Sequence, residues 1–156
     1  MKKQFFHSLL CLGLLGLMSF TACKKNDSEI DPIQSPTAMQ TTIKITVAEK
    51  TFTAELVDNP TTASFLQMLP LTLDMQELNR NEKFFRLEKS LPTQASVPSS
   101  IRTGDLLLYG DNTLVLFYKS FNTSYSYTPM GTIKDPAGLE AALGAGNVTV
   151  KFEVEN

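Results

Sequence analysis

The sequence predicts a mainly β domain, built as a closed β-barrel with two short helices that cap its ends. Three observations lead to this prediction. Apolar and polar residues alternate with a period of two in several short stretches, as they do in strands with one buried face. Two other stretches have a capping residue and a proline at their start and a proline or glycine at their end, as short helices do. About seven strands and two helices fit a small barrel, and a β-sandwich is the alternative on pattern alone.

The chain begins with the layout of an export signal. Two lysines precede the almost uncharged apolar run 5–20, which is shorter than the roughly 20 residues of a membrane-spanning helix. The small residues Thr21 and Ala22 then precede Cys23. This Phe-Thr-Ala-Cys sequence resembles a bacterial lipobox, which implies cleavage before Cys23 and a diacylglycerol on its sulfur. An ordinary secretory signal with an incidental cysteine is the alternative.

We therefore expect residues 1–22 to be a lipoprotein signal peptide, and Cys23 to anchor the mature chain to a lipid bilayer. The residues after Cys23 are lysines rather than the aspartate that resembles an inner-membrane retention signal. This favours an outer-membrane lipoprotein of the cell envelope, facing either the periplasm or the exterior. Residues 23–42 are polar, contain two prolines and lack an apolar period, which predicts a flexible tether before a domain at 43–156.

The composition of the mature chain excludes several kinds of site. Loss of residues 1–22 removes two of the 14 basic residues and none of the 16 acidic ones, so the net charge becomes −4. The remaining chain has no histidine or tryptophan, and Cys23 is its one cysteine. This excludes cysteine–histidine pairs, Ser-His-Asp triads and imidazole or thiolate metal sites. We expect no cofactor and no metal, and the mild acidity argues against nucleic acid as a partner.

The strands are predicted by alternation and by turns. Apolar residues at 43, 45 and 47 and at 52, 54 and 56 form a hairpin, and the stretch 148–154 repeats the pattern near the C-terminus. Residues 110–112, Gly-Asp-Asn, supply a further turn. The other strand candidates are 71–75, 83–87, 105–109 and 113–121.

Two helices are predicted between the strands. The first covers 59–70, with Asp58 or Asn59 as N-cap and a proline at each end. The second covers 135–144, with Asp135 as cap, a proline at its first position and Gly144 as its C-terminal stop. Their apolar stripes are predicted at residues 63, 66 and 69 in the first helix and at 139, 142 and 143 in the second.

The order hairpin, helix, strands, helix and final strand is that of the cyclophilins. Residues 59–69, Asn-Pro-Thr-Thr-Ala-Ser-Phe-Leu-Gln-Met-Leu, resemble the first cyclophilin helix. Four stretches resemble strand motifs of bacterial cyclophilin-like families, namely 81–85, 104–109, 114–118 and 130–133. Over residues 43–155 the chain thus resembles a bacterial cyclophilin-like domain. The resemblance implies a closed cyclophilin-like β-barrel and, for such domains, generally no established activity.

One candidate site lies on the stretch KFFRL, where Phe84 and Arg86 are predicted to point out of the barrel together. Phe-x-Arg resembles the strand that presents the catalytic arginine of cyclophilins. The resemblance implies that Arg86 would stabilise a twisted prolyl amide. Residues 88–100 contain nothing like the Gln-Gly-Gly-Asp stretch of true cyclophilins, and their pocket tryptophan and histidine are missing. The alternative is a surface arginine that pairs with Glu82 or Glu88.

A second candidate is the loop 121–130, FNTSYSYTPM, in which Tyr125 and Tyr127 alternate after Tyr118 and Lys119. Tyrosines offer a large contact area with a polar tip at low entropic cost, which suits a peptide or glycan surface. A packed loop that covers the barrel mouth is the alternative reading.

Glu82 stands beside two phenylalanines, so its carboxylate is predicted to be partly buried and to need a partner, either Lys119 or Arg86. These features together predict a non-catalytic module that binds a peptide or other ligand in a groove around Phe84, Arg86, Tyr118 and Tyr125. A weak peptidyl-prolyl isomerase that acts through Arg86 is the alternative, and a scaffold that binds another envelope protein is a third.

Overall fold

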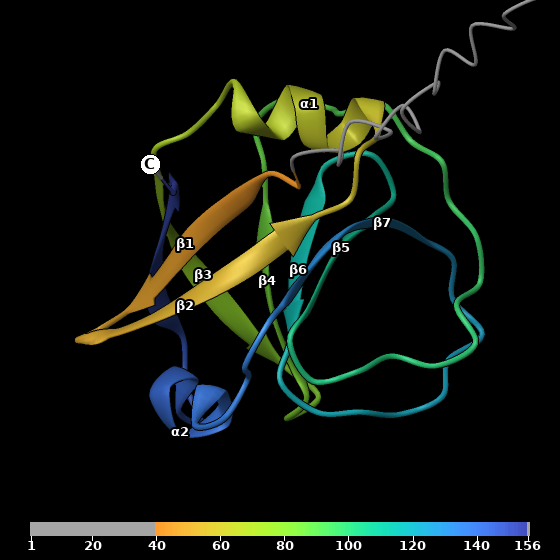
Figure 1. The fold of residues 1–156 in the computed structure, drawn as a ribbon. Coiled ribbons are helices and arrows are strands. Elements are labelled where there is room, and N and C mark those ends of the chain that lie inside the picture. Colours follow the sequence, from red (N-terminus) through yellow and green to blue (C-terminus); the bar gives the residue numbers. More distant parts are fainter. Residues whose placement is uncertain (1–39, 156) are drawn as a thin grey trace, which may run out of the picture. The chain divides into compact units, whose positions relative to one another are not determined.

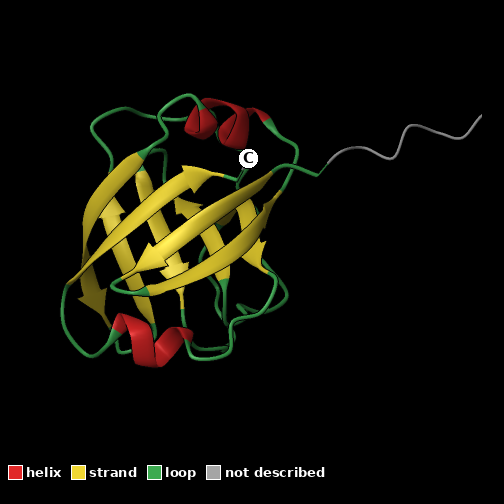
Figure 2. Cartoon of the chain, turned by 60° about the vertical axis from the view of Figure 1, so that its left-hand side comes forward, coloured by secondary structure: helices red, strands yellow, loops and turns green. Residues whose placement is uncertain are grey.

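The computed structural model describes residues 40–155. Eight antiparallel strands close into a barrel, in which each strand pairs with its neighbours in the order β1-β2-β7-β5-β6-β4-β3-β8 (Figures 1 and 2). The strands are β1 Thr42–Val47, β2 Lys50–Leu56, β3 Leu71–Leu78, β4 Glu82–Arg86, β5 Asp105–Tyr109, β6 Thr113–Phe117, β7 Tyr127–Ile133 and β8 Val148–Val154. The closed barrel confirms the predicted fold, and the β-sandwich alternative is wrong.

The barrel belongs to the part of the chain that follows residue 35. The predicted signal peptide (1–22), the lipidation site at Cys23 and all but the end of the predicted tether lie outside the described residues. In the part that is described, no helix is long and apolar enough to cross a membrane.

The barrel interior is filled by the apolar residues that alternate along the strands. In β1, Ile43, Ile45 and Val47 are fully buried, and they pair with β2 on one side and β8 on the other. In β8, Val150 and Phe152 are equally buried. The period of two places the polar residues between them on the outer face. The first and last strands of the domain therefore lie side by side.

The strand β7 was not among the strands predicted from alternation, because most of it lies in the stretch interpreted as a loop. Its sequence, YTPMGTI, contains a proline and a glycine. A β-bulge interrupts its pairing with β5 between Leu106 and Leu107, and such bulges absorb an extra residue. Gly131 is required at the seam with β2, since a Cβ atom there would lie 2.5 Å from the Glu55 carbonyl oxygen.

The two helices lie at opposite ends of the barrel (Figure 2). Helix α1, Pro60–Leu66, is shorter than predicted, but Asn59 caps it as expected: its Oδ1 accepts a hydrogen bond of 2.9 Å from the Thr62 backbone N–H. Its buried face consists of Thr61, Thr62 and Phe65. The Phe65 ring packs edge-to-face against Phe152 of the barrel core. The predicted stripe at 63, 66 and 69 is therefore wrong for the exposed residue 63, whereas the other two are partly buried.

Helix α2, Leu139–Leu143, is also shorter than predicted and has Gly138 as its N-cap. Asp135 instead accepts a hydrogen bond from the Ala137 backbone N–H, in the turn that precedes the helix. Gly144 ends the helix as predicted, and Leu139 and Leu143 face the core.

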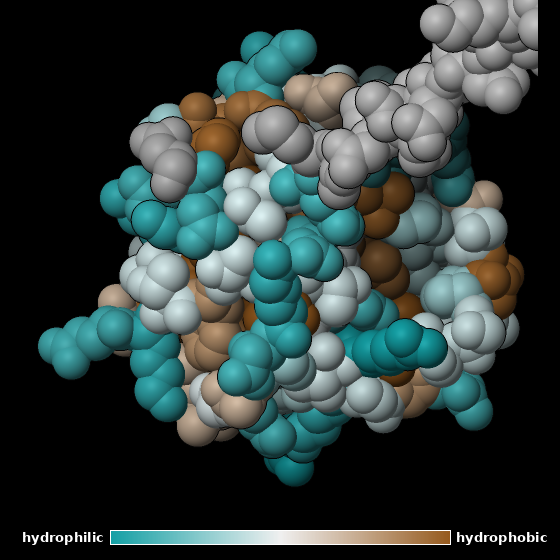
Figure 3. All heavy atoms as spheres, viewed as in Figure 1, coloured by the Kyte–Doolittle hydropathy of each residue, from teal (hydrophilic) through white to brown (hydrophobic). Residues whose placement is uncertain are grey.

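A second, smaller apolar cluster lies outside the barrel. It contains Ile101, Leu107, Val115, Phe117 and Tyr127. Leu107 and Val115 point outward from β5 and β6 but are buried, because the segments 87–104 and 118–126 fold over this side of the barrel (the right-hand loops in Figure 1). Two pairs of backbone hydrogen bonds hold the first segment in place, one between residue 96 and residue 127 of β7, and one between residue 101 and residue 121 of the second segment. The face drawn in Figure 3 is mostly hydrophilic, with hydrophobic atoms at the bottom of a recess over β5 and β7.

Candidate functional site

Strand β4 places its alternate side chains on opposite sides of the barrel wall. Phe85 packs against the main core inside the barrel, whereas Phe84 packs against the outer apolar cluster. The predicted outward direction of Phe84 and Arg86 is therefore confirmed, and Glu82 shares their face because it lies two residues before Phe84.

The outer face of β4 forms the floor of a cleft with a volume of about 560 Å³. Its walls come from the turn between β3 and β4, the ends of β5 and β6, and the segment 121–127. The structure brings five of the predicted site residues together here, namely Glu82, Phe84, Arg86, Tyr125 and Tyr127. Further lining residues are Leu78, Asn79, Asn81, Tyr109, Thr113, Val115, Phe121, Asn122, Thr123 and Ser124.

Aromatic rings form one side of the cleft as a continuous series. Tyr109 contacts Tyr125 and Tyr127, with ring centroids 6.1 and 5.6 Å apart, and Tyr127 in turn meets Phe117 at 5.6 Å. The edge-to-face and tilted arrangements are those that the charge distribution of aromatic rings favours. The series changes from buried to accessible along its length: Tyr127 is buried, while Tyr109 and Tyr125 are 46% and 62% exposed. The cleft thus presents two accessible tyrosine rings at its rim.

A nearly buried carboxyl group lies among these rings. Glu82 is only 8% exposed, and across residues 40–155 its carboxylate takes part in no ion pair. Burial, with a further contribution from the negative charge of Glu77, raises the pKa of Glu82 to about 7. The predicted partners are wrong for this carboxylate, since Lys119 pairs with Glu140 and no ion pair of Arg86 occurs among the described residues.

Asn81, the residue before Glu82, adds a second polar group without a partner. Its Oδ1 is buried and accepts no hydrogen bond from any described residue. Asn81 and Glu82 both line the cleft, directly after a tight turn in which Asn79 and Arg80 have positive φ values of 54° and 59°. Buried polar atoms usually have partners, and the Asn81 Oδ1 is an exception among the described residues.

Tyr127 is a cleft tyrosine whose pKa is affected by the charge of this carboxyl group. Burial and the charge of Glu82 raise the pKa of Tyr127 to about 12. Its hydroxyl group is therefore protonated at neutral pH. Arg86 is exposed and lies at the opposite end of β4 from Glu82.

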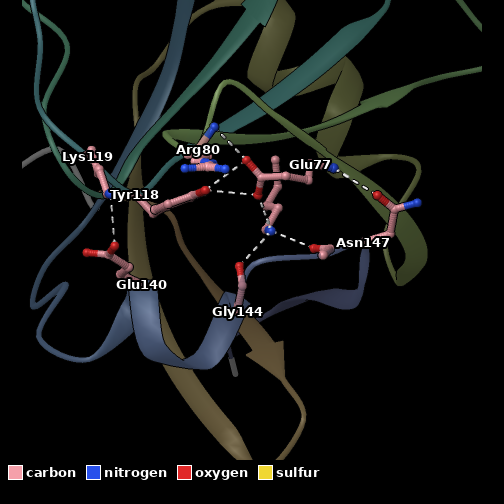
Figure 4. Close-up of polar contacts among 9 residues, drawn as sticks. Glu77, Arg80, Tyr118, Lys119, Glu140, Gly144 and Asn147 are labelled. Carbon is pink, nitrogen blue, oxygen red and sulfur yellow. Dashed lines mark hydrogen bonds and ion pairs between the residues drawn. The ribbon is translucent and has the colours of Figure 1, made fainter.

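The structure places Tyr118 and Lys119 away from the cleft. Tyr118 continues the inward series of Leu114 and Leu116, so the period of two carries it to the inside of the barrel. There its hydroxyl group donates to the Glu77 carboxylate, with both oxygens at 2.9 Å. Lys119 lies on the surface, 3.1 Å from Glu140 of α2 (Figure 4).

The inward face of β4 holds a buried cation that the sequence analysis missed. Lys83 is fully buried, and its ammonium group donates to the Glu77 carboxylate and to the carbonyl oxygens of Gly144 and Gly146, the latter two at 2.9 and 2.6 Å (Figure 4). The ammonium also lies 5.3 Å from the centre of the Tyr118 ring. Burial alone would raise the pKa of Glu77, but hydrogen bonds from Lys83 and Tyr118 and the Lys83 charge outweigh burial and lower it. This network closes the α2 end of the barrel.

The sequence carried a signal for the missed part of the cleft. The stretches 106–108 and 114–117 are apolar without alternation, which is typical of strands with both faces buried. This pattern indicates that loops cover the outside of β5 and β6, and such cover creates a cleft wall. No comparable signal marks Tyr109 or Asn81. Within residues 40–155, no group of three or more histidine, cysteine, aspartate or glutamate side chains is arranged to hold a metal ion.

Comparison with known proteins agrees with this architecture. A model of the Cyclophilin-like family matches residues 45–153. The chain belongs to the cyclophilin-like family. It is similar to the solution structure of a hypothetical protein from Archaeoglobus fulgidus, with a TM-score of 0.52 and 18% sequence identity over 74% of this chain and 95% of that chain. At this identity the similarity concerns the fold alone. No curated protein matches the chain.

Proposed function

We propose that this protein is a lipid-anchored envelope protein whose cyclophilin-like barrel is a non-catalytic binding module. Its ligand, a peptide or a segment of another envelope protein, binds in the cleft on the outer face of β4. The proposal includes an acylated Cys23 in the outer membrane and a flexible tether that carries the barrel. No cofactor takes part.

The observation that carries the binding proposal is that accessible aromatic rings and a nearly buried carboxyl group line one cleft. Tyr109 and Tyr125 are exposed, while Glu82 is only 8% exposed and forms no ion pair within residues 40–155. Ligand sites combine apolar walls with a few convergent polar groups. Leaving such polar groups unsatisfied costs free energy, and a ligand that supplies donors recovers it.

The binding proposal is tested on residues 23–156 carrying Cys23→Ser, which contain the whole barrel. Capped tripeptides with varied central residues are titrated into the ¹⁵N-labelled protein and followed by NMR. We expect shifts confined to the cleft, and loss of binding in Phe84→Ala and Tyr125→Ala. Val154→Ala, which removes an exposed apolar side chain from β8, should leave binding unchanged. Shifts scattered over the surface, or none at millimolar peptide, would contradict the proposal.

The anchor is tested separately in cells. The full chain is expressed with a Gram-negative export system, and its membrane and soluble fractions are compared with those of Cys23→Ser. We expect the unchanged chain to float with outer-membrane vesicles and the variant to remain soluble or unprocessed, because several acyl chains hold a protein to a bilayer essentially permanently. Equal distribution of the two chains would refute lipidation at Cys23.

Weak prolyl isomerase activity is the second candidate, and one observation favours it. Arg86 lines the cleft beside Phe84, which is the arrangement implied by the cyclophilin strand that presents its catalytic arginine. A protease-coupled assay with a proline peptide decides between the two functions. Acceleration that disappears in Arg86→Ala supports an enzyme, whereas no acceleration leaves the binding module.

A further inference from the structure

We propose that the cleft accepts a lysine side chain of a peptide ligand, with the ligand's ammonium group bound by the Glu82 carboxylate. This inference rests on the proposed binding function and names the chemistry that the site selects.

The protein itself shows what a buried ammonium group requires. On the inner face of β4, the Lys83 ammonium is bound by one carboxylate, from Glu77, by the carbonyl oxygens of Gly144 and Gly146, and by the face of the Tyr118 ring. Three hydrogen-bond acceptors match the three N–H donors of an ammonium group. The aromatic ring adds a cation–π interaction.

The outer face of the same strand offers two of these kinds of group. Glu82 supplies a carboxylate that forms no ion pair within residues 40–155, and Tyr127 supplies an aromatic ring. Both residues line the cleft. The outer site therefore has a carboxylate and a ring, as the inner one does, but its carboxylate has no cation bound to it among the described residues.

The depth of the carboxylate favours a long, thin side chain. Glu82 is only 8% exposed, and it shares the cleft with Phe84, Tyr109 and Tyr127. A lysine has a flexible four-carbon stem that packs along apolar surface while its charge reaches a partner. Arginine carries a broad planar fork that suits bidentate contacts.

Arg86 determines which groups the rest of the ligand must present. It lies four residues from Glu82 on the same face of β4, which corresponds to about 13 Å along a strand. Its guanidinium group is exposed and lines the cleft. A peptide whose lysine occupies the Glu82 end therefore extends toward Arg86, where its backbone carbonyl groups accept hydrogen bonds.

The experiment compares four fluorescent capped pentapeptides that differ only in the central residue: lysine, norleucine, Nε-acetyl-lysine and arginine. Binding to residues 23–156 carrying Cys23→Ser is measured by fluorescence anisotropy. We expect the lysine peptide to bind at least about tenfold tighter than the norleucine and Nε-acetyl-lysine peptides, because hydrogen bonds to charged groups are stronger than neutral ones. The arginine peptide should also bind less tightly, because its planar fork is bulkier than an ammonium group. The additional substitution Glu82→Gln should abolish this preference. The matched control Glu49→Gln, in the exposed turn between β1 and β2, should retain it.

The pH dependence provides a second readout. The charged groups around Glu82 are Arg80, Arg86 and Glu77. The titratable groups that share the cleft are Tyr109, Tyr125 and Tyr127. Because Glu82 has a pKa of about 7, its ionised fraction rises roughly 30-fold between about pH 5.5 and pH 8. The affinity for the lysine peptide should rise by up to that factor, while Glu82→Gln should show a flat profile.

Four results would overturn the inference. Equal affinity for the lysine and norleucine peptides would show that the cleft does not select an ammonium group, although binding that depends on Tyr125 would leave the binding module intact. A preference for arginine would replace the narrow site by an open one. Lysine selectivity that survives Glu82→Gln would place the ammonium group elsewhere. If no pentapeptide binds, the inference fails, and the tripeptide titration decides separately whether the cleft binds peptides.

Discussion

The two faces of β4 differ in whether their buried charged group has partners. Lys83 points into the barrel, is completely buried and has three oxygen partners. Glu82, its neighbour in the chain, points out of the barrel, is almost as buried and has no ion-pair partner among residues 40–155. A buried charge with hydrogen-bond and ion-pair partners favours one arrangement of the core, whereas a buried charge without them lowers the stability of the fold. The contrast separates a structural network at Lys83 from the proposed binding site at Glu82, the adjacent residue.

The largest expected effect comes from removing the inner cation. Lys83→Met leaves the Glu77 carboxylate and the carbonyl oxygens of Gly144 and Gly146 without their shared donor. We expect a loss of about 3–5 kcal/mol in the free energy of unfolding, as for other broken buried ion pairs. Urea unfolding measures it. The double variant Lys83→Met with Glu77→Leu should recover part of the loss, and a cost below about 1 kcal/mol would contradict the structural role of the network.

Removal of the buried charge on the outer face should raise the free energy of unfolding rather than lower it. The folded-state pKa of Glu82, about 7, lies above its ordinary value of 4.5, so the folded protein binds the extra proton and wild-type stability falls as the pH rises from about 4.5 to 7. Glu82→Gln removes this loss. We expect it to be more stable than the wild type by about 2 kcal/mol at pH 8 and about equal at pH 4.

Urea unfolding of both proteins across this range tests the sign. Glu77 does not interfere above pH 5, because its pKa is lowered and its stabilising contribution disappears only as the pH falls below its ordinary value. A variant that is less stable than the wild type at pH 8 would mean that the Glu82 carboxylate has a partner after all.

A smaller effect is expected for Tyr118→Phe. This change removes the hydroxyl group that donates to both Glu77 oxygens but keeps the ring beside Lys83. The expected cost is about 1–2 kcal/mol, because the Glu77 carboxylate retains Lys83 as a partner. NMR titration of Glu77 should also show a higher pKa in the variant. An unchanged pKa would remove Tyr118 from the network.

The smallest effect on stability is expected for Tyr125→Ala at the rim of the cleft. Tyr125 is 62% exposed and contacts Tyr109 through its ring edge, so the free energy of unfolding should change by less than about 0.5 kcal/mol. Peptide binding, by contrast, should be lost. A variant that unfolds readily would indicate that Tyr125 closes the outer apolar cluster rather than offering a binding surface.

Much of the barrel follows from the sequence because alternation is a local property. The hairpin of β1 and β2, the last strand, the start of α1 and the end of α2 are set by residues adjacent in the chain, Asn59 and Gly144 in the case of the helices. Strand β7 escaped this reasoning because its proline, bulge and Gly131 break the pattern. Those residues are explained only by the strands they meet, as the close approach of Gly131 to Glu55 shows.

The candidate site divides in the same way. The sequence by itself determined the alternation along β4, and therefore that Glu82, Phe84 and Arg86 share one face. Only the tertiary structure decided which other residues join them. Tyr109 and the tyrosines of the segment 121–127 come together because two distant segments fold over β5 and β6, whereas Tyr118 turns inward to Glu77. The physical reason is that strand periodicity acts over neighbouring residues, while a cleft depends on contacts between segments far apart in the chain.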